Sequence, residues 1–79
     1  MATGYHATTP AKLAKYEASR AILPPVRWWS TEGAARRWMK RVTGRTVLLA
    51  IETPQMTFPL PVRGGAMWTP EYVRTWKEM

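Results

Sequence analysis

Three observations predict a small α+β domain in this chain of 79 residues. Residues that cap helices stand before helix-forming stretches at Thr9, at Ser30-Thr31 and at Thr69. Residues 56–62, MTFPLPV, alternate apolar residues with others, which is typical of a strand. The tripeptide Arg63-Gly64-Gly65 follows directly and predicts a tight turn into a second strand. Helices and a hairpin that follow one another in this way indicate an α+β fold.

The composition indicates an anionic partner. Twelve Lys and Arg residues against five acidic residues give a net charge of +7 and a pI near 10.6, which favours DNA, RNA or a membrane surface as partner. Cysteine is absent, so disulfides and thiolate metal sites are excluded. No paired carboxylates or activated nucleophile appear, so we expect no enzyme activity, no catalytic residues, no metal site and no cofactor. Since no segment resembles a signal peptide or a membrane span, we expect a cytoplasmic protein.

The first 29 residues are predicted to form a tail and a short helix. Residues 1–8 are polar, so we expect disorder there, with His6 as a histidine of the tail. Thr9 then caps a helix that begins at Pro10 and continues until Pro24-Pro25. Residues 24–29 form a linker, in which one of the two adjacent tryptophans, Trp28 or Trp29, is expected to be exposed.

A second helix is predicted over residues 31–42. Ser30 or Thr31 can cap it, and Glu32 suits the positive end of the helix dipole. Apolar residues recur on one face, while Arg36, Arg37, Lys40 and Arg41 occupy the rest of the helix. A solvated face is the plain interpretation of these cations; phosphate contact is the functional one.

Residues 45–52, RTVLLAIE, follow a turn at Thr43-Gly44 and are ambiguous. Five consecutive apolar residues fit either a buried strand or a short buried helix. We take the helix, because a helix, a short turn and a second helix form a helix-turn-helix, and a hairpin follows it. A strand here would remove the recognition helix.

The hairpin and a last helix complete the prediction. The prolines of residues 56–62 leave only one side of this strand able to pair, and residues 66–68 form its partner. Thr69 caps a final helix whose first residue is Pro70. The predicted domain, residues 30–79, is therefore a small winged helix-turn-helix with a two-stranded wing, to which residues 1–29 add a helical appendage. Trp38, Trp68 and Trp76 are expected in its core.

The stretch FPLPVRGGAMWTPEYVRTW, residues 58–76, resembles the C-terminal half of phage excisionases and AlpA-like regulators in the wider MerR-like winged-helix group. The similarity covers roughly residues 30–79. The residues that carry it are Phe58, Pro59, Pro61, Val62 and Arg63 in a Phe-Pro-x-Pro-Val-Arg motif, Gly64, Gly65 and Trp68 in the wing, and Val73 and Trp76 in the final helix.

The resemblance implies a recombination directionality factor without catalytic activity. Such a protein binds and bends double-stranded DNA at the arms of a phage attachment site, associates with itself along that DNA, and acts with the phage integrase in the bacterial host. Exposed apolar surface at Tyr16, Ile22 and Trp28 would join neighbouring protomers.

Two other functions remain open. The chain could be a transcriptional regulator on the same scaffold, or a small basic structural subunit of a large nucleoprotein assembly. For the DNA-binding interpretation, the expected contacts are Arg36, Arg37, Lys40, Arg41, Thr43, Arg45 and Thr46, together with Arg63 and Gly64 of the wing tip.

Overall fold

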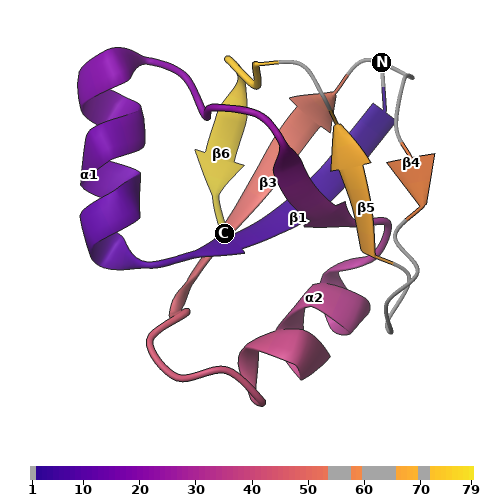
Figure 1. Cartoon of the computed structure of the whole chain (residues 1–79). Helices are drawn as coiled ribbons and strands as arrows, with labels where there is room; N and C mark the ends of the chain where they lie inside the picture. The colour runs from indigo at the N-terminus through magenta and orange to yellow at the C-terminus, as the bar shows by residue number, and fades with distance from the viewer. Residues whose placement is uncertain (1, 54–57, 60–65, 70–71) are drawn as a thin grey trace.

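The computed structural model describes residues 2–53, 58–59, 66–69 and 72–79. Within these residues it contains two helices and one six-stranded sheet, in which the strand order is β4-β5-β2-β1-β3-β6 and all neighbours are antiparallel (Figure 1). The expected α+β class is thereby confirmed. The elements are β1 (Ala2–Thr8), α1 (Pro10–Ser19), β2 (Val26–Trp29), α2 (Glu32–Met39), β3 (Val47–Thr53), β4 (Phe58–Pro59), β5 (Ala66–Thr69) and β6 (Trp76–Glu78).

The N-terminal residues form a central strand, so the prediction of a disordered tail is wrong. β1 pairs with β3 along its whole length, from Ala2 opposite Thr53 to Thr8 opposite Val47. Its sequence lacks the alternation of apolar and polar residues by which a half-buried strand is recognised. The strand is stabilised instead by its backbone ladder and by cover on both faces. Residues 1–29 therefore contribute two strands, β1 and β2, to the common sheet and are not an appendage to it.

Residues 47–53 are also a strand, and the predicted recognition helix is not present in residues 45–52. Leu48 and Leu49, adjacent in β3, are both buried, on opposite faces of the sheet. A strand covered on both faces has a continuous apolar sequence, as this one has. The helix-turn-helix prediction fails here, because a run of five apolar residues fits both structures and the pairing with β1 decides between them.

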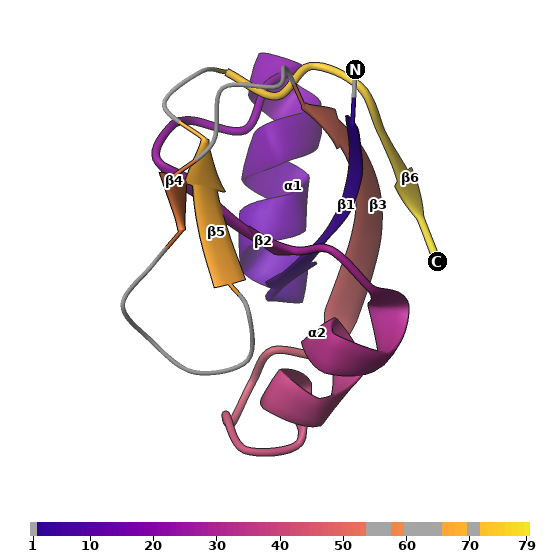
Figure 2. The ribbon, with the colours of Figure 1, turned by 90° about the vertical axis from the view of Figure 1, so that its right-hand side faces the viewer.

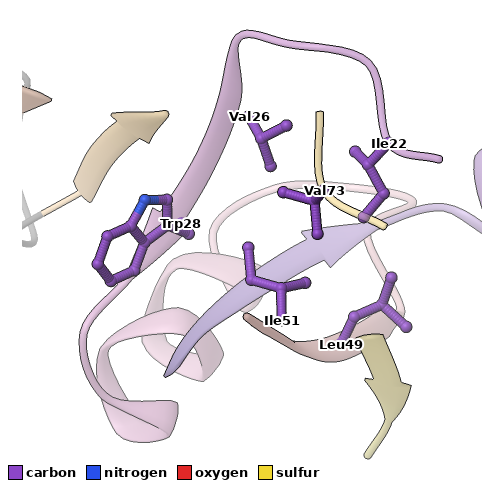
Figure 3. Close-up of a cluster of buried hydrophobic side chains, with 6 residues drawn as sticks. All are labelled: Ile22, Val26, Trp28, Leu49, Ile51 and Val73. Atoms are coloured by element: carbon purple, nitrogen blue, oxygen red, sulfur yellow. The ribbon is translucent and has the colours of Figure 1, made fainter. Parts of the chain in front are cut away.

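The two helices lie over opposite faces of the sheet. On one face, Leu13 and Tyr16 of α1 pack against a cluster formed by Ile22, Val26, Trp28, Leu49, Ile51 and Val73 (Figure 3). On the other face, Ala34, Ala35, Trp38 and Met39 of α2 pack with Tyr5, Ala7, Trp29 and Leu48. Figure 2 shows α1 between β5 on one side of the view and β3 on the other. The core is thus divided into two small clusters by the sheet.

Both helix starts agree with the sequence. The Thr9 side chain accepts a hydrogen bond from the Lys12 amide at 3.1 Å, and Pro10 is the first residue of α1. The Thr31 side chain accepts from the Ala34 amide at 3.2 Å, so Thr31, and not Ser30, caps α2. Both helices end earlier than predicted. In α1 the residue after the end, Arg20, adopts a left-handed conformation with φ of 58°.

The paired strands of the predicted hairpin are confirmed, whereas the predicted final helix is not. Phe58 lies opposite Trp68 and Pro59 opposite Met67; the turn residues 63–65 lie outside the described residues. Where a helix was expected after Thr69, the chain instead forms an isolated bridge between Val73 and Ile22 and then β6, which pairs with β3. Thr69 itself is the last residue of β5 and is buried.

The tryptophans also depart from expectation. Trp28 and Trp29 are both buried, with 4% and 1% of their surfaces exposed, so neither is available for a partner. Ile22 is buried as well, which removes most of the surface predicted for self-association. Trp38 and Trp76 are half-buried at the edges of the two clusters. The side chain of Trp68 lies outside the described part of the chain.

Candidate anion-binding site

β1 and β2 diverge beyond one point of contact, and this divergence creates the candidate site. The two strands pair at Tyr5 opposite Trp29. Farther along the two strands, side chains form hydrogen bonds with the backbone carbonyls that face the opening. The His6 ring nitrogen Nδ1 lies 2.6 Å from the Arg27 carbonyl oxygen, and Arg45 Nη1 donates to the Ala7 carbonyl at 3.2 Å. Buried backbone acceptors need such partners, so both side chains are fixed at the opening.

A pocket of about 510 Å³ lies at this opening. Residues of α1, the 20–25 loop, β1, β2 and α2 contribute to it, together with Arg45. Its charged side chains are Lys12, Lys15, Arg27 and Arg45, and no carboxylate appears in the described lining. A cavity lined by charges of one sign concentrates ions of the opposite sign. This geometry therefore suits an anion.

A chain of hydrogen bonds fixes the wall of the pocket nearest α1. Thr8 donates its hydroxyl to the Tyr16 oxygen at 3.2 Å, and the Tyr16 hydroxyl lies 3.2 Å from His6 Nε2. The Arg27 carbonyl can only accept a hydrogen bond, so we assign the imidazole proton to Nδ1. His6 Nε2 then accepts from Tyr16. The four groups form one directed chain from Thr8 to Arg27.

His6 is a buried neutral residue, and the prediction of a tail histidine is wrong. Its side chain is 7% exposed. Burial lowers the pKa of His6 below the ordinary value of 6.5; the nearby charges of Arg45 and Lys12 lower it further, and the hydrogen bond to the Arg27 carbonyl opposes them. His6 thus lies near two of the cations that line the pocket, Lys12 and Arg45.

Trp38 holds two of the cations. The guanidinium carbons of Arg27 and Arg45 each lie 5.7 Å from the centroid of its ring, a distance at which the ring face attracts a cation. The ring itself packs against Trp29, at a centroid separation of 4.8 Å. The rings of Trp38 and Trp29 thus hold the guanidinium groups of Arg27 and Arg45 at the same pocket, although these two like charges repel each other.

The predicted DNA contacts divide into three groups. Arg45 is half-buried and lines the pocket. Arg63 and Gly64 lie outside the described residues. Six residues are exposed on α2 or on the segment that leads to β3: Arg36, Arg37, Lys40, Arg41, Thr43 and Thr46.

The exposed cations of this segment form what we call the α2 basic surface, defined as Arg36, Arg37, Lys40 and Arg41. Glu32 makes an ion pair with Arg36 at 2.6 Å, one turn away along the helix. Gly44, with φ of 88°, allows the chain to turn toward β3, as the sequence predicts. The cations that line the pocket and those of the α2 basic surface are therefore two separate groups.

Sequence reasoning missed the rest of the pocket. Lys12, Lys15, Tyr16 and Ser19 recur at helical spacing and therefore share one face of α1, which is a signal that could have grouped them. For Arg27 and His6 no local signal exists, because the divergence of β1 from β2 brings them to the site.

Among the described residues, no group of His, Cys, Asp or Glu is arranged to hold a metal ion. Neither helix of the described chain is long and apolar enough to cross a membrane. No family model, curated protein or solved structure matches the chain.

Proposed function

We propose that the chain binds double-stranded DNA through the α2 basic surface, by contacts to the phosphate backbone. The observation that carries the proposal is the concentration of charge in this surface. Four exposed cations lie within six residues, and Glu32, the acidic residue of α2, is paired with one of them. Arg and Lys side chains release counterions when they contact phosphates, and this supplies affinity that does not depend on sequence.

Recognition of a particular DNA sequence needs a different explanation from the one predicted. Residues 47–53 form a strand inside the sheet, so base contacts from that segment are not part of the proposal. α2 itself is a short helix with exposed basic residues, and a single helix fits into the major groove. The role of excisionase, with integrase as partner and DNA bending as mechanism, stays a prediction that rests on the resemblance of residues 58–76.

A salt titration of duplex binding tests the proposal. Each phosphate contact adds about 0.9 to the slope of log affinity against log salt. The double variant Lys40→Gln/Arg41→Gln should therefore lower the slope by about 1.8, while Lys77→Gln, an exposed lysine of β6, serves as the matched control. An equal slope in the wild type and the double variant would contradict the proposed contact between the α2 basic surface and DNA.

The same titration separates the possible roles. Binding to attachment-site DNA that exceeds binding to scrambled DNA by about a thousandfold or more indicates a site-specific factor. Equal binding to both DNAs indicates a basic subunit whose charge serves a larger nucleoprotein assembly.

A further inference from the structure

We propose that the pocket between β1 and β2 binds one nucleotide through its phosphate and base: a free nucleoside monophosphate or the 5′-phosphorylated end of a strand. The volume of about 510 Å³ lies within the range of small-ligand sites. The inference concerns a different group of residues from the α2 basic surface. Its strand-end form rests on the proposed function, and its free-nucleotide form does not.

The charges favour a phosphate. Lys12 and Lys15 come from α1, Arg27 from β2 and Arg45 from the segment before β3, so three distant parts of the chain place cations around one opening. Arg27 and Arg45 both lie against the ring of Trp38. A phosphate monoester carries up to two negative charges, and guanidinium groups bind its oxygens with paired hydrogen bonds.

The apolar part of the pocket lining suits a planar, largely apolar group. Ile22, Leu23, Pro25 and Val26 line it. Leu23 is 65% exposed, which makes it one of the few large apolar side chains on the described surface. A lining that contains both apolar and basic side chains fits a ligand with two chemically different ends, as a nucleotide has. Bases bind such surfaces through their π-faces, largely without regard to sequence.

Trp29 supplies an independent observation. It lines the pocket and is 1% exposed, and its indole nitrogen, like that of Trp28, is buried and has no hydrogen-bond partner among the described residues. A buried N–H donor without a partner is rare in folded proteins and calls for an explanation. Phosphate and base oxygens are acceptors that could satisfy this donor.

The test uses His6 as a reporter in the full-length chain. It is the only histidine in the sequence, so its ring signals in an NMR spectrum are unambiguous. We expect deoxyadenosine monophosphate to shift these signals and to raise the pKa of His6, because a bound dianion favours the imidazolium form. Deoxyadenosine and inorganic phosphate, as separate probes, should each bind more weakly.

Variants on an exposed helix face keep the test independent of folding. Lys12→Gln/Lys15→Gln should weaken nucleotide binding at least about tenfold, as expected for the loss of charge-assisted hydrogen bonds; Lys77→Gln should leave it unchanged. The proposal is wrong if the nucleotide leaves the His6 signals unmoved at millimolar concentration, if the double variant binds equally well, or if inorganic phosphate binds as tightly as the nucleotide.

Two further arms identify the source of the nucleotide and keep the two proposals apart. A 5′-phosphorylated oligonucleotide that shifts His6, where its 5′-hydroxyl counterpart does not, assigns the pocket to strand ends; a shift with the free nucleotide alone assigns it to a small molecule. Lys40→Gln/Arg41→Gln should weaken duplex binding without changing nucleotide binding. Loss of one function with retention of the other shows which proposal has failed.

Discussion

The packing of Gly4 against Trp28 gives the sharpest test of the fold. A Cβ atom added at Gly4 would overlap the six-membered ring of Trp28, which is buried in the larger core cluster. The ring cannot move aside without disturbing its neighbours, because interiors are close-packed. Overpacking of this kind costs about 1–3 kcal/mol. In a domain of this size, each kcal/mol lowers the midpoint of thermal unfolding by about 4–8 °C.

The assay is thermal or urea unfolding of Gly4→Ala beside a matched control. Gly33 lies in α2, and a Cβ atom there would meet only the Arg37 side chain, at 3.7 Å. Gly33→Ala should therefore stabilise the protein by about 0.5–1 kcal/mol, since alanine favours the helix. The same substitution thus has opposite signs at the two positions. If Gly4→Ala unfolds at the wild-type temperature, residues 2–8 do not lie against Trp28, and the central strand is misplaced.

Two further predictions concern the pocket and the second helix. Because the pKa of His6 is lowered in the folded chain, the unfolded chain takes up a proton first as pH falls below about 6.5; stability should decrease there, by at most about 1.4 kcal/mol per pH unit. His6→Gln should flatten this dependence in urea titrations between about pH 7 and pH 5, and equal slopes would show that His6 is not buried as a neutral base. Thr31→Ala removes the cap of α2 and should lower the free energy of unfolding by about 1 kcal/mol. Thr31→Ser keeps a capping hydroxyl and should retain most of this stability. Equal losses of stability in the two variants, measured by urea unfolding, would contradict the assignment of the cap.

Local signals in the sequence were sufficient where a structure depends on neighbouring residues. Thr9 and Thr31 cap their helices because each hydroxyl needs only an amide three residues ahead. Gly44 marks a turn because its φ is positive. Both predicted hairpin strands, in residues 56–62 and 66–68, contain a described strand.

The candidate site was less accessible to sequence reasoning. Arg45 was identified, but as a DNA contact on a recognition helix, whereas it lines the pocket and bonds the Ala7 carbonyl. Arg27 and His6 meet although 21 positions separate them. No periodic pattern in the sequence predicts this contact, because the contact depends on the point at which β1 and β2 separate.

The sequence by itself determined the charge, the α+β class, the two helix starts and the strands of the hairpin. Tertiary structure alone decided that residues 2–8 and 47–53 are paired strands, that β6 replaces a predicted helix, and that Trp28 and Trp29 are both buried. The physical reason is the same in each case. A cap, a turn or a hairpin is stabilised by residues close by in the chain, whereas β1, β3 and β6 are stabilised by partners more than 20 residues distant and by whatever covers their faces.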